Sequence, residues 1–252
     1  MNSRMNFTGK KIVLAGSGGI GSATAELLAS LGAQMILLDV SEENLKDTIG
    51  KLAGEGHAYY ICDFFAVDEI EAVITRIVQE QGPVDGYVHC TGVGSVRPLK
   101  MSKYDFMLRV MNINFFSFVE VVRCLTKKGA FNEGMNIVGI SAVGAYIGNS
   151  TKTAYCASKA AMNGAVRCMA KELAPKGIRM NTVAPGSTDT PMAREAADYR
   201  EGSDDYRMNE MRQYLGTCQP SDIADAVAFL LSDMSKMISG LCLPVDGGKL
   251  TV

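Results

Sequence analysis

A glycine-rich turn near the amino terminus constrains the fold of this chain more than any other segment. The turn, Gly16–Gly21, follows a short apolar run at Lys11–Ala15 and opens a stretch, Ile20–Leu31, whose apolar residues recur at helical spacing. Its sequence fits G-x-G-x-x-G, in which glycine allows a tight turn and lets a pyrophosphate approach the free N–H groups of a helix N-terminus. The strand–turn–helix context therefore predicts a dinucleotide-binding turn made of Gly16, Ser17, Gly18, Gly19, Ile20 and Gly21.

The rest of the chain continues this alternation of short apolar strands with amphipathic helices. Further strands are predicted at residues 34–39, 58–62, 84–90, 136–140, 179–184 and 241–245, and helices at 42–52, 67–81, 103–125, 153–174 and 222–231. Strands that alternate with helices of this length form parallel βαβ units. We therefore predict an α/β fold, with a single Rossmann-type domain over residues 1–252 and a doubly wound parallel sheet with helices on both faces.

A long irregular stretch interrupts this pattern at about 190–215. It is rich in charge, tyrosine and methionine, and such a stretch is either a disordered insertion or a functional lid. We expect a substrate lid. Its tyrosines and methionines, with Tyr146 and Ile147, would suit an apolar alcohol or ketone, whereas its arginines would suit an acidic substrate.

Composition excludes several classes of protein. The 252 residues are 47% apolar and 21% charged, close to globular averages, which argues against a disordered chain. The formal net charge of -2 argues against a nucleic-acid partner held by bulk positive charge. The longest charge-free run, Gly134–Thr151, is broken by polar residues and is a poor membrane span, so we expect no membrane partner.

Cysteine and histidine usage indicates the compartment and limits the chemistry. The seven cysteines form no C-x-x-C pair and the amino terminus has no apolar leader, which together favour reduced thiols in a cytoplasmic protein. His57 and His89 are the only histidines, so a multi-histidine metal site is nearly excluded and no metal is expected. A Ser-His-Asp or Cys-His hydrolase would have to use one of them, and we interpret both as surface or helper residues.

An acidic residue at the end of the second predicted strand indicates which dinucleotide the turn would bind. Asp39 lies 18 residues after Gly21, where a carboxylate accepts hydrogen bonds from the adenosine ribose hydroxyls. The same negative charge repels a 2′-phosphate. Asp39 therefore predicts NAD as the cofactor and makes NADP less favourable.

Tyr155 and Lys159 are four residues apart in the predicted helix at 153–174 and therefore lie on one face of it. A phenol with a pKa of about 10 is a poor acid–base group at neutral pH, but an adjacent ammonium stabilises the phenolate and lowers that pKa. With its pKa lowered in this way, Tyr155 could exchange a proton with a carbonyl or alcohol oxygen while NAD accepts or donates a hydride.

These motifs, in register along nearly the whole chain, resemble the classical short-chain dehydrogenase/reductase family. The resembling segments are Ala15–Gly21, Asp63, Val88–Gly92, Asn114, Ser141–Lys159, Asn181–Met192 and Asp246–Gly248. The resemblance implies a Rossmann-type domain, NAD(P)-dependent interconversion of a small-molecule alcohol and ketone, and a homotetramer or homodimer. Helices at about 103–125 and 153–174, apolar on more than one face, are buried either in the core or in a subunit interface, and the resemblance suggests the interface.

The resemblance also implies a role for individual residues. Tyr155 resembles the family's general acid/base, Lys159 the group that lowers its pKa and binds the nicotinamide ribose, and Asn114 the asparagine that supports a proton-relay water. Asp63 matches the aspartate that contacts adenine, and Gly92 matches the glycine beside the cofactor's ribose. The segment that holds the nicotinamide carboxamide is matched by Pro185, Gly186, Thr188 and Thr190.

The sequence departs from the family pattern at three places. The glycine turn is one residue short and is preceded by Ala15 instead of threonine, and Cys90 stands where the family has a stabilising asparagine. Ala142 lies 13 residues before Tyr155, where the family has its catalytic serine, and Ser141 lies one place early. A shift of one residue on an extended chain turns a side chain to the other face.

Three interpretations of Ala142 stay open. The loop is re-registered so that Ser141 supplies the catalytic hydroxyl, or the chain is a natural variant with weakened catalysis, or the alanine is a deliberate substitution. Loss of one donor of this kind costs about 10²–10³-fold in rate. An NAD-dependent oxidoreductase is therefore predicted, and the alternative is a catalytically weak nucleotide-binding or redox-sensing protein of the same fold.

Overall fold

Seven parallel strands form one sheet in the computed structural model, which describes residues 5–94, 96–198 and 212–251. In chain order the strands are β1 Lys11–Ala15, β2 Gln34–Asp39, β3 Ala58–Ile61, β4 Val84–His89, β5 Phe131–Ile140, β6 Arg179–Pro185 and β7 Cys242–Val245. Their order across the sheet is β3-β2-β1-β4-β5-β6-β7, and every neighbouring pair is parallel. This confirms the predicted doubly wound fold, whose strand order reverses between β1 and β4.

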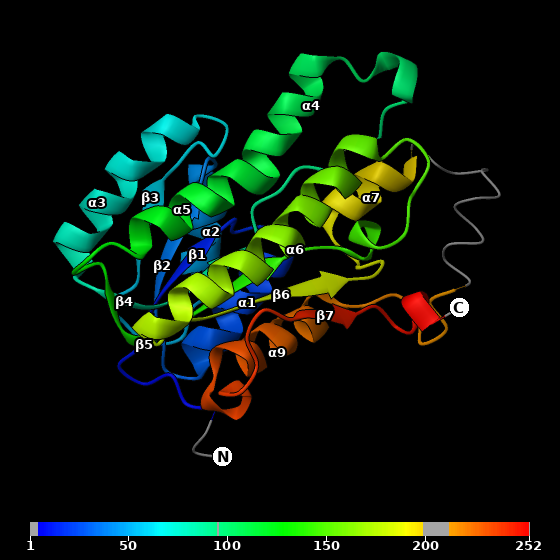
Figure 1. The fold of residues 1–252 in the computed structure, drawn as a ribbon. Helices are drawn as coiled ribbons and strands as arrows, with labels where there is room; N and C mark the ends of the chain where they lie inside the picture. Colours follow the sequence, from blue (N-terminus) through cyan, green and yellow to red (C-terminus); the bar gives the residue numbers. More distant parts are fainter. Residues whose placement is uncertain (1–4, 95, 199–211, 252) are drawn as a thin grey trace.

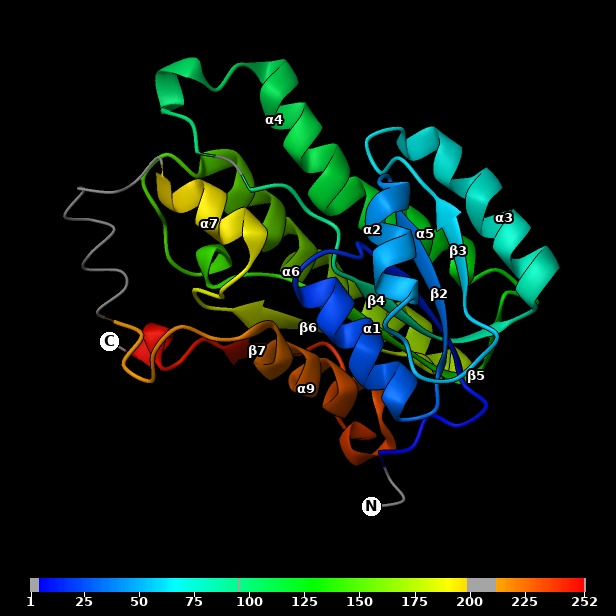
Figure 2. The same ribbon diagram turned by 180° about the vertical axis from the view of Figure 1, so that it is seen from behind.

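Helices cover both faces of this sheet. On the face seen in Figure 1 lie α3 (Ile70–Gln81), α4 (Tyr104–Met111), α5 (Ser117–Leu125) and α6 (Thr153–Leu173). Figure 2 shows the other face, covered by α1 (Ile20–Ser30), α2 (Glu42–Ile49) and α9 (Pro220–Leu231). A short helix, α7 (Pro191–Asp198), follows β6. In the part of the chain that the structure describes, no helix has the length and apolar character needed to cross a membrane.

Apolar side chains fill the space on each side of the sheet. Tyr87, Phe118 and Met162 belong to the cluster under α3, α5 and α6, and Leu28 and Val227 belong to the cluster under α1 and α9. Because both faces are covered, β1 and β2 are buried along nearly their whole length, and this explains why their sequences are continuously apolar instead of alternating.

Local signals fix where several helices begin. The Ser41 hydroxyl accepts a hydrogen bond from the Asn44 backbone N–H (3.2 Å), so Ser41 caps α2. Pro220 stands in the first turn of α9, and Asp222 and Gln219 form a capping box before it. The helix therefore begins two residues earlier than predicted.

Two elements differ from the sequence prediction. β5 begins at Phe131, five residues early, because Phe131 already pairs with Val84 of β4, and regular pairing resumes at Asn136 after a register shift around the exposed Glu133. The predicted helix at 103–125 contains a π-helical turn, Asn112–Phe116, between α4 and α5. π-helical turns are rare and occur frequently at functional sites. This turn carries Asn114, one of the residues that the sequence singled out.

Candidate active site

Glycines bring the loops that follow several strands into contact at the carboxyl edge of the sheet. A Cβ atom on Gly16 would lie 2.7 Å from the backbone nitrogen of Thr91, so the turn after β1 packs directly on the end of β4. A Cβ atom on Gly19 would lie 3.2 Å from Cγ2 of Thr190, in the segment after β6. Open α/β sheets bind ligands at this edge, beside the point where the strand order reverses. We therefore take the loops that follow β1, β4 and β6 at this edge, called the crevice below, as the candidate active site.

The glycine turn has the shape of an anion cradle. A Cβ atom on Gly21 would lie only 1.7 Å from the carbonyl oxygen of Gly16, whereas a Cβ atom on Gly18 would meet nothing within 4 Å. Within the described residues, the backbone N–H groups of Gly18, Gly19 and Ile20 donate no hydrogen bond. Free N–H groups beside open space at the N-terminus of α1 fit a dinucleotide pyrophosphate.

Asp39 faces this turn from the end of β2. Its Oδ2 accepts hydrogen bonds from the backbone N–H of Ser17 (2.7 Å) and from the Ser17 hydroxyl (2.9 Å). Its Oδ1 accepts a bond from the Ser41 N–H at 2.9 Å. Thr48, from α2, donates its hydroxyl to the Ser17 carbonyl oxygen at 2.9 Å. The carboxylate is therefore held in one orientation at the edge of the crevice.

Tyr155 and Lys159 lie together on α6, as their spacing predicts. The Lys159 Nζ lies 5.9 Å from the centre of the Tyr155 ring, and it donates a hydrogen bond to the Ile140 carbonyl oxygen at 2.7 Å. Lys159 is only 3% exposed, and this burial lowers its pKa to about 8. A Cβ atom on Gly92 would lie 3.4 Å from the Lys159 Nζ, so the loop after β4 passes close to the same ammonium.

Asn114 links the loop after β4 to α6. It is fully buried, and its Oδ1 accepts a hydrogen bond from the Val93 N–H (2.8 Å). Its Nδ2 donates to the Val93 carbonyl oxygen (3.2 Å) and to the Ser158 hydroxyl (3.0 Å). A Cβ atom on Gly92 would lie 3.4 Å from Asn114 Oδ1. The structure thus brings Asn114, Gly92 and Lys159 together.

The hydroxyl of Ser141 points into the protein. Ser141 is 1% exposed, and its Oγ donates a long hydrogen bond (3.4 Å) to the Lys159 carbonyl oxygen. Ala142 follows in an extended conformation, with φ -166° and ψ 156°. Successive side chains of an extended chain point to opposite sides, so the Ala142 methyl group points away from the side to which the Ser141 hydroxyl points. This geometry argues against the expected catalytic role of Ser141.

The segment after β6 is held by a residue that the sequence did not indicate. Gln213 is 4% exposed, and its side-chain amide pairs with both backbone groups of Ser187, accepting from the N–H (2.7 Å) and donating to the carbonyl oxygen (2.9 Å). Gly186 and Thr188 flank this pair, and Pro185 is the last residue of β6. The contact joins residues that are 26 apart in the chain, so no local sequence pattern predicts it.

Asp63 and His89 occupy different environments from the crevice residues. Asp63 is exposed after β3, and its Oδ1 accepts a hydrogen bond from the Phe65 N–H (2.9 Å). Of the two roles that we expected, surface or helper, burial excludes the first for His89: it is fully buried, with Nδ1 2.6 Å from the Tyr87 hydroxyl oxygen. Burial, with a smaller contribution from Lys159, lowers the pKa of His89, so the imidazole is neutral at pH 7.

Part of the predicted lid lies outside the described residues, at 199–211. Its first segment is helical instead of irregular and forms α7. Thr190 precedes this helix and caps it, because its hydroxyl and carbonyl oxygens both accept hydrogen bonds from the Ala193 N–H. Met192 reaches the loop after β4: a Cβ atom on Gly94 would lie 3.4 Å from its Sδ. The start of the predicted lid therefore contacts the crevice.

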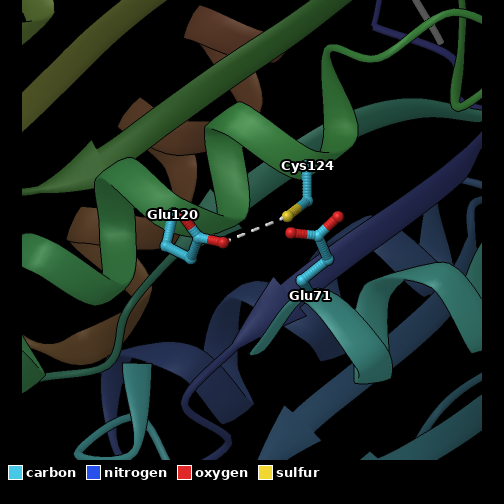
Figure 3. A group of neighbouring side chains, drawn as sticks. All are labelled: Glu71, Glu120 and Cys124. Atoms are coloured by element: carbon cyan, nitrogen blue, oxygen red, sulfur yellow. Dashed lines mark hydrogen bonds between the residues drawn. The ribbon is translucent and has the colours of Figure 1, made fainter. Parts of the chain in front are cut away.

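Figure 3 shows a group of side chains, outside the crevice, whose ligand atoms lie close enough to hold a metal ion. The group consists of Glu71 from α3 and Glu120 and Cys124 from α5. The Arg123 guanidinium contacts both carboxylates, and Lys127 contacts that of Glu71. Burial raises the pKa of Cys124 to about 11, which disfavours the thiolate. The ion pairs hold α3 against α5, and a metal ion would have to displace two cations.

Comparisons with known proteins identify the family. A family model described as enoyl-(acyl carrier protein) reductase matches residues 14–249. The chain is 32% identical to the 3-oxoacyl-(acyl-carrier-protein) reductase FabG of Thermotoga maritima, over 97% of this chain and 99% of that protein. It is also 32% identical to the 7alpha-hydroxysteroid dehydrogenase of Escherichia coli, over 98% and 96%. The chain belongs to the short-chain dehydrogenase/reductase family.

Solved structures of similar proteins have the same fold. A dehydrogenase/reductase from Sinorhizobium meliloti superposes with a TM-score of 0.88 at 30% identity, covering 98% of this chain and 97% of that one. An aldohexose dehydrogenase from Thermoplasma acidophilum superposes with a TM-score of 0.85 at 28% identity, covering 99% and 96%. The relatives are oxidoreductases, and members of this family use nicotinamide cofactors. The substrates in the names of these relatives differ, so membership alone does not assign a substrate to this chain.

Proposed function

We propose that this protein is an NAD-dependent oxidoreductase that interconverts a secondary alcohol and a ketone. The observation that carries the proposal is the position of Tyr155. The centre of its half-buried ring lies 5.9 Å from the buried Lys159 ammonium, and Lys159 lies beside Gly92 in the loop after β4, one of the strands at the reversal point. An ammonium at this distance stabilises a phenolate, which is what a phenol needs to exchange protons near neutral pH.

Each residue of the site has a distinct proposed task. In ketone reduction the Tyr155 O–H bond breaks and its proton passes to the substrate oxygen, while the bonding pair stays on the phenolate. The Lys159 ammonium stabilises that phenolate, and the Ile140 carbonyl oxygen fixes the ammonium in place. Asn114 holds the loop after β4 against α6 and is proposed to support the proton-relay water. When bound, NAD supplies the hydride chemistry.

The cofactor is proposed to lie along the carboxyl edge, with its pyrophosphate on the turn Gly16–Gly21 and its adenosine ribose at Asp39. Asp63 is proposed to contact the adenine, and the segment from Pro185 to Thr190 to hold the carboxamide. A carboxylate fixed by Ser17 and Ser41 cannot turn away from a 2′-phosphate, so NADPH is repelled. Calorimetric titration with NADH and NADPH tests this: NADH should bind more tightly, and tighter NADPH binding would refute the proposed preference.

The alanine at position 142 predicts a low turnover rate for this chain. With Ser141 turned inward, the site lacks the hydroxyl that resembles an oxyanion donor, and such donors contribute about 10²–10³-fold to rate. A screen with NAD and steroids, sugars and hydroxy-acyl compounds should therefore show weak turnover in this chain. Ala142→Ser should raise that turnover by about the same factor. Equal turnover rates in the two proteins would contradict the prediction that the missing serine hydroxyl slows the reaction.

The same observation favours a second candidate, a catalytically weak nucleotide-binding or redox-sensing protein. Under that function the chain would bind NADH through the turn and Asp39, but it would oxidise no alcohol in the screen. Ala142→Ser separates the two candidates, because restored turnover indicates a weakened enzyme and continued inactivity with retained NADH binding indicates a sensor.

We further propose a cytoplasmic homotetramer or homodimer built from one domain. Apolar side chains are exposed before and at the start of α4, where Leu99 is 71% and Tyr104 75% exposed, and subunit burial would cover them. Phe116, 41% exposed at the end of the π-helical turn, is a further apolar side chain that subunit burial could cover. Light scattering tests the assembly: a monomer at micromolar concentration would contradict it.

A further inference from the structure

Lys152 is a second lysine beside the proposed acid/base. Its Nζ lies 5.3 Å from the centre of the Tyr155 ring, closer than the 5.9 Å of Lys159. Cations within about 6 Å of a ring centre interact favourably with it. Lys152 is half-buried at the N-cap of α6, whereas Lys159 is buried about two turns into the helix, so the ring receives one cation from near the surface and one from the interior.

The position of Lys152 is unfavourable for the helix itself. The N-terminus of an α-helix carries the positive end of the helix dipole, where acidic residues stabilise and lysine does not. The first turn of α6 contains no acidic residue, and the Lys152 side chain does not cap it. Helix stability therefore does not explain why a lysine stands here.

The backbone before Lys152 is strained in a way that fixes its position. Thr151 has φ +65°, and it is the non-glycine residue with positive φ in the described chain. A β-branched residue rarely adopts this conformation, and such outliers persist only where surrounding contacts enforce them. The Arg97 N–H donates to the Thr151 carbonyl oxygen (2.8 Å), the Lys152 N–H donates to that of Asn149 (3.2 Å), and the Cys156 N–H donates to that of Lys152 (2.9 Å).

A second cation would supply stabilisation of the Tyr155 phenolate that the other residues of the site do not fully provide. Ala142 provides no hydroxyl, and the desolvated Lys159 loses its charge as the pH rises through its pKa of about 8. The titratable groups on this side of the crevice include Lys152, Lys159 and Cys156, with Cys90 and His89 near Lys159. A half-exposed ammonium keeps part of its hydration, so it can stabilise a neighbouring phenolate without the full cost of burial.

We propose that Lys152 is a positioning and electrostatic residue of the acid/base site that stabilises the phenolate of Tyr155 together with Lys159. The proposal rests on the proposed function, in which the Tyr155 proton passes to the substrate oxygen and leaves the phenolate behind. The strained turn at Thr151 holds the Lys152 ammonium over the ring while this charge develops.

Titration of Tyr155 itself tests the proposal without requiring turnover. The near-ultraviolet absorbance of tyrosinate is followed against pH in the full chain and in Tyr155→Phe, and the difference isolates Tyr155. The same pair is measured in the background of Lys152→Gln, Lys152→Arg and Lys171→Gln. Lys171 is the matched control, because it is an exposed lysine near the other end of α6.

Lys152→Gln should raise the ionisation midpoint of Tyr155 by about one pH unit, a tenfold change in the phenolate fraction. Lys152→Arg should restore the midpoint, and Lys171→Gln should leave it unchanged. The shift should shrink with added salt, because Lys152 is half-exposed. An unchanged midpoint in Lys152→Gln, or an equal shift in Lys171→Gln, would overturn the proposal. Failure to bind NADH would refute the proposed function instead and would leave the titration result standing.

Discussion

At the scale of single residues, the candidate site contains charges that work against stability. Lys159 is the clearest example, since its ammonium is buried and its hydrogen bond to the Ile140 carbonyl oxygen replaces only part of its hydration. Its pKa is lowered from 10.5 to about 8 by this burial. A group kept at such a cost is expected to serve a function and not the fold.

Lys159→Met should therefore stabilise the protein at pH 7 while abolishing turnover. Between about pH 8 and 10.5 the folded chain binds fewer protons at Lys159 than the unfolded chain, so stability rises with pH across this window. The penalty is fully present below pH 8 and has an upper limit on the order of 3 kcal/mol. Urea unfolding at pH 7 and pH 10 measures it, with the exposed Lys171→Met as control. A destabilised variant at pH 7 would contradict this account.

At the scale of elements, the turn between β1 and α1 combines two kinds of glycine. Gly21 is required by the fold, because a Cβ atom there would collide with the Gly16 carbonyl oxygen at 1.7 Å. Gly18 has open space around it and is required, in our proposal, by the ligand. The sequence motif does not distinguish these reasons, but the packing does.

Gly18→Ala should leave the free energy of unfolding within about 0.5 kcal/mol of the wild type. It should still weaken NADH binding about tenfold or more, because the methyl group occupies the space proposed for the pyrophosphate. Gly21→Ala should instead lower stability by several kcal/mol, since backbone must move. Urea unfolding and NADH titration of both variants check this. Normal NADH binding by Gly18→Ala would contradict the proposed pyrophosphate site.

The segment after β6 allows the binding of the nicotinamide half of the cofactor to be tested separately from the ADP-ribose half. Because Gln213 holds Ser187 by two hydrogen bonds, Gln213→Ala should loosen the loop proposed for the nicotinamide. We expect NAD binding to weaken about tenfold, which corresponds to about 1.4 kcal/mol for the lost positioning. Binding of ADP-ribose, which lacks the nicotinamide, should stay unchanged. Calorimetry with both ligands measures this, and an equal loss for both would assign Gln213 to general stability.

At the scale of the whole molecule, the seven-stranded order and the crevice at the β1/β4 reversal follow from patterns that can be read in the sequence. Short-range spacing predicted the glycine turn and the pair of Tyr155 and Lys159, because their geometry depends on a single turn or helix. The inward hydroxyl of Ser141 and the support from Gln213 could not be predicted, since each depends on contacts between distant elements. The burial of His89 depends on packing between β4 and the helices above it.

The central claim is that Tyr155 transfers the proton in an NAD-dependent reaction, and Tyr155→Phe tests it most directly. Phenylalanine keeps the ring that packs beside Lys159 and removes only the hydroxyl, so NADH affinity should remain within about twofold, less than 0.5 kcal/mol. Turnover of any substrate found in the screen, measured in the Ala142→Ser background for sensitivity, should fall by about 10²–10⁴-fold. Undiminished turnover by Tyr155→Phe would contradict the account.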